Sequence, residues 1–87
     1  MKEEIKKELE TLKMMIKNWK ESYKEIGGID SLEDFRFEID EIVYPYLRNL
    51  YITGHITFEE LQEFMRFCDE ELSQIEKFIK RKVKEKT

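Results

Sequence analysis

The most apolar stretch of the chain lies at residues 42–52 and reads Ile42-Val43-Tyr44-Pro45-Tyr46-Leu47-Arg48-Asn49-Leu50-Tyr51-Ile52. The segments on both sides of it are highly charged, and their apolar residues recur at regular intervals. We therefore expect this stretch to form the centre of the fold, with the two flanking segments packed against it.

The N-terminal segment carries apolar residues at alternating spacings of four and three: Ile5, Leu9, Leu12, Ile16, Trp19, Tyr23 and Ile26. Such a heptad pattern is typical of a helix that buries one face. It predicts a helix over about residues 2–26. Gly27-Gly28 is expected to end this helix, because glycine adopts the left-handed conformation that closes a helix without a steric clash.

A second helix is expected over about residues 31–52, with Asp30 or Ser31 as its N-cap. Its predicted buried face contains Leu32, Phe35, Ile39, Ile42 and Tyr46, and is widened by Val43 and Leu50. Pro45 lies inside this helix, where it lacks a backbone N–H, so a kink or a break is expected there. An alternative interpretation of residues 50–58 is a β-hairpin around Gly54, because β-branched and aromatic residues lie on both sides.

A turn at Gly54-His55 and a capping box of Thr57 and Glu60 are expected to precede a third helix over about residues 57–85. The apolar residues of this helix again alternate in spacing: Phe58, Leu61, Met65, Cys68, Leu72, Ile75 and Ile79. Three helices joined by short turns pack with consecutive helices antiparallel. The expected fold is all-α: a single domain, residues 1–87, forming an up-down-up three-helix bundle with long outer helices and a central helix kinked at Pro45.

Composition bounds the location of the protein. Cys68 is the only cysteine, which favours a reducing, cytoplasmic location. The sequence shows neither a signal-peptide pattern nor a run of about 18 apolar residues, so we expect no membrane span. Lys and Glu are abundant while Ala is absent, and a Lys/Glu-rich composition is typical of thermophile proteins.

Candidate catalytic residues are few. His55 lies at a predicted turn and Cys68 on a predicted buried face, so neither is expected to act in catalysis. The acidic clusters at residues 59–63 and 69–71 contain no histidine at metal-binding spacing, and we interpret them as solvated helix faces. The sequence therefore predicts a protein that is not an enzyme, with no metal site and no cofactor.

Gly54-x-Ile56-x-x-x-Glu60 is similar to the second half of an EF-hand calcium loop. The family's first, third and fifth loop positions fall on Asn49, Tyr51 and Thr53, which lack carboxylates. We therefore interpret this segment as a capped turn.

Arg36-x-x-Ile39-Asp40-x-Ile42 resembles the start of the first helix of helical chorismate mutases. The family's further cationic residues, which hold the substrate's carboxylates, have no counterparts in the acidic middle of this chain. We interpret the segment as an amphipathic helical turn with an Arg36–Asp40 pair.

Several apolar residues exceed what the three predicted buried faces hold: Met14, Phe37, Tyr44, Leu47, Tyr51, Phe64, Phe67 and Phe78. The aromatic residues at positions 37, 44 and 51 are seven apart, on the side of the central helix opposite its predicted buried face. Exposed rings beside an arginine are typical of interface centres. We predict a protein interface on this outer face, made by Phe37, Tyr44, Leu47, Arg48 and Tyr51. The predicted function is a self-associating interaction module, a homodimer, with another protein partner possible.

Two alternatives remain open. A kink at Pro45 would turn Tyr44 or Tyr51 inward. The C-terminal end, although the net charge of the chain is −4, carries a basic cluster that suits a polyanion: Lys77, Lys80, Arg81, Lys82 and Lys84. With Lys13, Lys17, Lys20 and Lys24 it predicts, as the alternative function, a nucleic-acid-binding accessory protein.

Overall fold

The computed structural model describes the backbone of residues 2–85 and the side chains of these residues except 29 and 82–85. The elements are α1 (Glu3–Ile26), α2 (Ile29–Glu38), a π-helical turn η1 (Ile39–Val43), α3 (Tyr44–Ile52) and α4 (Phe58–Glu85). The all-α prediction is confirmed, and no strand occurs in the described range. The hairpin alternative at residues 50–58 is wrong.

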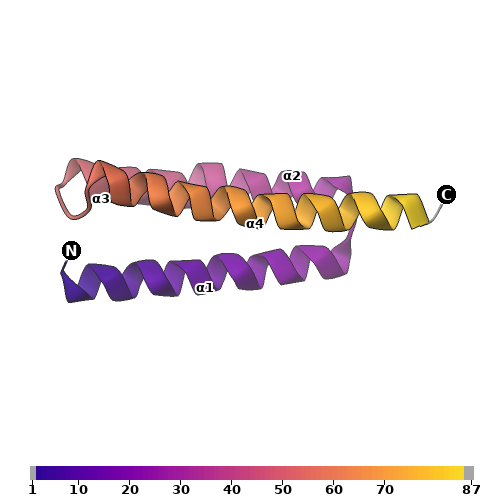
Figure 1. Cartoon of the computed structure of the whole chain (residues 1–87), viewed down its shortest axis with the longest axis horizontal. Helices are drawn as coiled ribbons and strands as arrows, with labels where there is room; N and C mark the ends of the chain where they lie inside the picture. Colours follow the sequence, from indigo (N-terminus) through magenta and orange to yellow (C-terminus); the bar gives the residue numbers. More distant parts are fainter. Residues whose placement is uncertain (1, 86–87) are drawn as a thin grey trace.

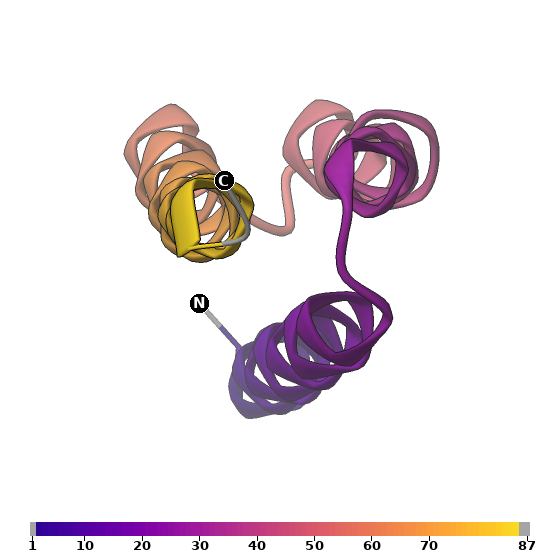
Figure 2. The same ribbon diagram turned by 90° about the vertical axis from the view of Figure 1, so that its right-hand side faces the viewer.

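The elements α2, η1 and α3 follow one another without a break, and we call them together the central rod. Figure 1 shows α1 and α4 running in one direction and the central rod in the other. Seen along the long axis, the three lie at the corners of a triangle (Figure 2). The molecule measures 50 × 18 × 17 Å, and its helix contacts are consistent with the predicted three-helix bundle.

One hydrophobic core runs between the three rods. Each rod contributes buried residues at the spacings its sequence pattern predicts, except for one shift in the central rod described below. A second exception is Phe64 of α4, one of the surplus apolar residues, which is buried in the core. The buried apolar residues are Leu9, Ile16, Phe35, Ile39, Val43, Leu47, Leu50, Ile56, Leu61, Phe64, Cys68, Ile75 and Ile79. Two predicted core residues at helix ends, Ile26 and Phe58, are exposed instead.

The core face of the central rod shifts by one residue at η1. Ile42 and Tyr46, predicted to be buried, are 54% and 39% exposed, whereas Val43 and Leu47 are each 0% exposed. The tyrosine N–H at position 44 bonds the carbonyl of Ile39, five residues earlier, so the turn holds one residue more than an α-turn. Because of that extra residue, every later side chain is rotated by ~100° about the helix axis, relative to its place in a regular α-helix.

Pro45 explains why the wide turn lies where it does. It is in the first turn of α3, directly after η1, and has no N–H with which to continue the hydrogen-bond ladder. The helix therefore passes the proline by widening the turn before it, and π-turns and prolines are both common causes of helix bending. The kink predicted at Pro45 stays a prediction.

The turn between α1 and α2 begins at Gly27, which has φ 74° and donates its N–H to the carbonyl of Tyr23 at 2.9 Å. The predicted N-cap is wrong, because α2 begins two residues early and Gly28 holds the cap position. Ser31 is buried, and its Oγ donates to the carbonyl of Gly27 at 3.0 Å. The serine thus ties the first turn of α2 back to the end of α1.

Candidate protein-interaction surface

Three of the predicted interface residues lie together on α3. Tyr44, Arg48 and Tyr51 are at positions i, i+4 and i+7 of this helix, so they share one face. All three are exposed. The ring of Phe58, at the start of α4, lies 5.8 Å from that of Tyr51 and is exposed as well. We call Tyr44, Arg48, Tyr51 and Phe58 the α3 patch.

The other two predicted interface residues do not belong to this patch. Leu47 is buried in the core, because the extra residue of η1 turns it inward, so its place in the predicted interface is corrected here. Phe37 is 63% exposed on α2, and the same extra residue places it roughly a third of a turn away from Tyr44. The seven-residue spacing therefore does not give one straight stripe.

Arg48 provides the charge of the α3 patch. It makes no ion pair with any residue whose side chain the structure describes. A guanidinium free beside exposed rings can stack on an aromatic face and donate up to five hydrogen bonds. Three rings with one such cation form the composition that interface centres favour.

The other surplus aromatic residues lie under lysines of α1. Lys13 Nζ lies 5.2 Å from the ring centroid of Phe67 and 5.6 Å from that of Phe64, and Lys24 Nζ lies 4.8 Å from that of Phe78. These contacts place cations over ring faces, while the lysine stems shield the rings from water. The sequence pattern did not reveal them.

A buried ion pair joins α1 to α4. Lys20 Nζ lies 2.5 Å from Glu71 Oε2 and donates to Gln74 Oε1 at 2.6 Å. The interpretation of Glu71 as part of a solvated face is therefore wrong, and Lys20 is unavailable for the predicted basic surface. Both residues adjoin predicted core positions, Trp19 and Leu72, and that adjacency is the one sequence signal that could have found them.

Two tyrosine–glutamate hydrogen bonds join α1 to the central rod. Tyr23 donates to Glu38 Oε1 at 2.9 Å, and Tyr46 donates to Glu8 Oε2 at 2.7 Å. Burial, together with the bond to Glu38, raises the pKa of Tyr23 to about 12. The bond to Glu8 is the main cause that raises the pKa of Tyr46.

Tyr46 also lines a groove of about 310 Å³ between α1 and α3, with Leu12 and Met15 as the apolar part of its wall. The groove is crossed by the Tyr46–Glu8 hydrogen bond described above. A docking helix would have to break this bond, so the groove is a weaker docking surface than the α3 patch.

The basic end of α4 continues past the turn that joins α1 to α2 (Figure 1). Lys77, Lys80 and Arg81 are exposed, while the side chains of Lys82 and Lys84 lie outside the described part of the chain. Lys80 pairs with Glu76 at 2.8 Å and lowers the pKa of that carboxyl. Three of the α1 lysines, Lys13, Lys17 and Lys24, place their ammonium groups over aromatic rings of α4.

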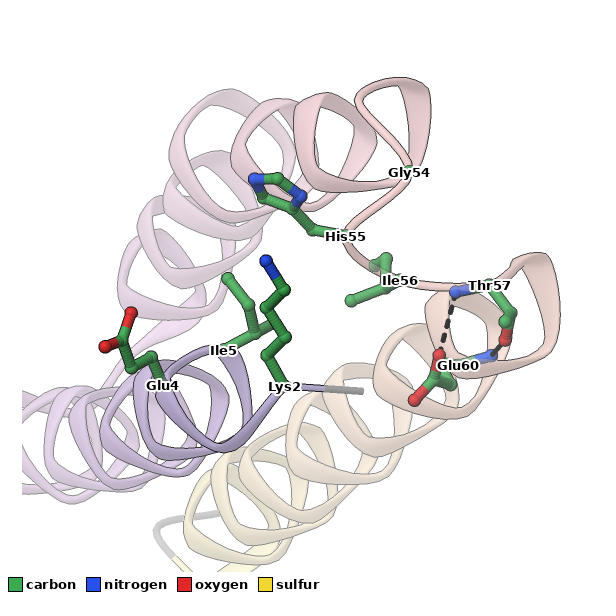
Figure 3. A pocket seen from close by; sticks show the side chains of 8 residues that line it. All are labelled: Lys2, Glu4, Ile5, Gly54, His55, Ile56, Thr57 and Glu60. Carbon is green, nitrogen blue, oxygen red and sulfur yellow. Dashed lines mark hydrogen bonds between the residues drawn. The ribbon is translucent and has the colours of Figure 1, made fainter.

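A pocket of about 380 Å³ lies at the other end of the molecule, under the turn at Gly54 (Figure 3). The predicted capping box is confirmed there: the Glu60 N–H donates to Thr57 Oγ1 at 3.1 Å, and the Thr57 N–H donates to Glu60 Oε1 at 2.8 Å. The backbone bond from Thr57 is the main cause that lowers the pKa of Glu60. This carboxylate thus caps α4, and His55 is exposed at the rim.

Groups suited to chemistry are scarce among the described residues. No group of three or more His, Cys, Asp or Glu side chains in that range is placed to hold a metal ion. Cys68 is fully buried, and burial raises the pKa of its thiol to about 12, which disfavours the reactive thiolate. The helices in the described range also lack the length and apolarity that crossing a bilayer requires.

Comparisons of the chain with protein-family models, with curated proteins and with solved structures found no match. The surfaces described above are therefore the basis for assigning a function.

Proposed function

We propose that this chain is a non-enzymatic protein-interaction module that self-associates as a homodimer through the α3 patch. The observation that carries the proposal is the α3 patch itself, in which two exposed tyrosines share a helix face with Arg48 and a third exposed ring, Phe58, lies against Tyr51. Arg48 makes no ion pair with a described residue. Covering these rings with a second copy removes apolar surface from water, at ~25 cal/mol for each Å² of apolar area.

The distribution of exposed apolar residues supports this choice of rod. Among the residues whose side chains the structure describes, ten large hydrophobic residues are exposed, and six of them lie on the central rod: Phe37, Ile42, Tyr44, Tyr46, Tyr51 and Ile52. A small protein that leaves so many apolar side chains on one element usually uses that element for contacts. Among the six, Tyr44 and Tyr51 belong to the α3 patch, where they share a helix face with Arg48.

The proposal also covers the arrangement of the three rods and the location of the protein. The three rods form an up-down-up three-helix bundle in solution, with the central rod kinked near Pro45, and the protein acts in the cytoplasm. The contacts of α1 and α4 with one another and with the central rod support the bundle. The single, buried cysteine supports a reducing compartment.

The test is size-exclusion chromatography with light scattering on three proteins. Tyr51→Lys places a charge in the α3 patch and is expected to leave a monomer. Met14→Lys, at an exposed apolar residue of α1, is the matched control and is expected to remain dimeric like the unmodified chain. A dimer that survives Tyr51→Lys, or a monomeric unmodified chain, would refute the proposal.

Nucleic-acid binding through the basic end of α4 is the second candidate, supported by the exposed Lys77 and Arg81, which make no ion pair with described residues. It predicts retention of DNA or RNA at low salt that weakens steeply as salt is added. Reversing both charges should abolish that retention. A chain that shows no binding at low salt would remove this candidate.

A further inference from the structure

The exposed residues of the central rod follow a pattern that is symmetric about Tyr44. Asp40 and Arg48 lie four residues before and after this tyrosine, and Phe37 and Tyr51 lie seven residues before and after it. The sequence of side-chain types is therefore aromatic, acidic, aromatic, basic, aromatic. Reversing the direction of the chain exchanges the acid with the base and leaves every ring matched to a ring.

The structure keeps Asp40, Tyr44 and Arg48 exposed on one side of the rod, each directly after a buried residue of the core. Asp40 lies in η1, one helical turn before Tyr44, and Arg48 lies one turn after it. Asp40 and Arg48 are both exposed, and neither forms an ion pair with another described residue. Phe37, three residues before Asp40, borders this face from the outer side.

A twofold axis at Tyr44 makes this face complementary to itself. In an antiparallel pair of central rods, the side chain at each position meets the one equally far on the other side of the axis. Arg48 of each copy then meets Asp40 of the other, and the two Tyr44 rings meet at the axis, while Phe37, turned aside by η1, lies at the border of the contact. In a parallel pair, like charges would meet at both positions.

We infer that two copies of this chain pack with their central rods antiparallel about Tyr44, held in register by two symmetric Asp40–Arg48 ion pairs between the copies. The inference rests on the proposed self-association and adds its geometry. Opposite charges that face each other across an interface fix register and exclude wrong arrangements more than they add affinity. The charges therefore specify the orientation, and the rings supply the contact area.

The test is a charge exchange measured by sedimentation velocity. Asp40→Arg and Arg48→Asp each place like charges opposite one another at two sites, and each is expected to raise the dimer dissociation constant by roughly tenfold or more. The double variant restores opposite charges in reversed order, so its dissociation constant is expected to return close to the original. Glu33→Arg, an exposed acid of α2 outside the symmetric pattern, is the control for net charge.

Circular dichroism on each variant verifies that the helices remain, since every substituted side chain is exposed. A dimer whose affinity the double variant does not restore would overturn the antiparallel geometry and leave the proposed self-association standing. An unmodified chain that stays monomeric, or that associates only with another protein, would overturn both.

Discussion

Lys20 of α1 and Glu71 of α4 form an ion pair at 2.5 Å with side chains that are only 10% and 6% exposed. Each charge is buried between the two helices and depends on the other, because removing an ion from water is costly unless a counter-charge compensates. The pair also requires α1 and α4 to stay at one relative height, since a slip of one turn would separate the charges by ~5 Å. We interpret it as the contact that sets the register of the two long outer helices.

Removing one partner of this pair should therefore destabilise the fold strongly. We expect Glu71→Gln to lower the free energy of unfolding by about 3 kcal/mol, because Lys20 stays buried without its counter-charge. Urea unfolding followed by circular dichroism measures this. The neighbouring exposed Glu70→Gln is the matched control, with an expected change under about 0.5 kcal/mol. Equal effects of the two changes would show that the pair is not buried in solution.

Replacing both charges tests the same pair differently. The double variant Lys20→Met/Glu71→Leu leaves no charge behind and keeps the volume apolar, so its stability should be close to that of the unmodified chain or higher. A double variant that loses as much stability as the two single variants combined would argue that the ion pair itself stabilises the fold.

Tyr23 should make the stability sensitive to alkaline pH. Its pKa is raised from 10.0 to about 12 in the folded chain, so the folded state keeps a proton that the unfolded state loses. Its contribution is therefore complete below pH 10 and is lost as the pH rises toward 12. Unfolding free energies measured across this interval should fall less steeply for Tyr23→Phe than for the unmodified chain.

At neutral pH the same substitution has a separate effect. Glu38 Oε2 is already buried without a hydrogen-bond donor among the described residues, and Tyr23→Phe removes the donor of Oε1 as well. We expect a loss of ~1–3 kcal/mol in the free energy of unfolding. Tyr46→Phe, which removes an exposed bond to Glu8, should cost less.

The capping box of α4 gives a prediction at acidic pH. Bonds from Thr57 hold the pKa of Glu60 below its ordinary 4.5, so the contribution of this carboxylate is present above pH 4.5 and is lost as the pH falls through the lower folded value. The stability gap between the unmodified chain and Glu60→Gln should therefore shrink on acidification. Thr57→Ala should cost about 1 kcal/mol at neutral pH. A gap that stays constant with pH would contradict the bonded geometry.

Deleting one residue from η1 should convert it into an ordinary α-turn. The core residues Phe35, Ile39, Val43, Leu47 and Leu50 are spaced four, four, four and three apart, and removal of the exposed Glu41 makes these spacings four, three, four and three. That pattern suits a regular α-helix. We expect this variant, with Pro45 also changed to alanine because a proline would interrupt a regular α-helix, to unfold cooperatively in thermal melts followed by circular dichroism.

Deletion of Glu70 is the control for this experiment. It also removes an exposed acid, here from α4, but it turns Ile75 and Ile79 away from the core by ~100°. That variant should lose its cooperative transition. If both deletions abolished the cooperative transition, η1 would not be one extra residue that the core of the central rod can lose.

The outer helices could be predicted from sequence because the apolar spacing of each fits only one choice of buried face. The apolar spacing from Ile5 to Tyr23 continues without interruption, and Thr57 with Glu60 marks the start of α4 by a known cap. In the central rod, the apolar spacing fits two different choices of buried face. Ile42 and Tyr46 are as apolar as Val43 and Leu47, so the pattern alone did not decide between a regular helix and one with a π-turn.

The candidate site was predictable only in part for the same reason. Tyr44, Arg48 and Tyr51 share a face in either register, whereas the assignments of Phe37 and Leu47 depended on the turn that precedes them. The buried pair of Lys20 and Glu71 was missed because a sequence pattern treats charged residues as exposed. Only the packing of α1 beside α4 brings these two charges together.

Sedimentation equilibrium of the unmodified chain over a wide range of concentrations tests the central claim, self-association, most directly. The account predicts an average mass that rises from the monomer value of 10.7 kDa toward twice that value as the concentration increases. A mass that stays at 10.7 kDa at every concentration would contradict it.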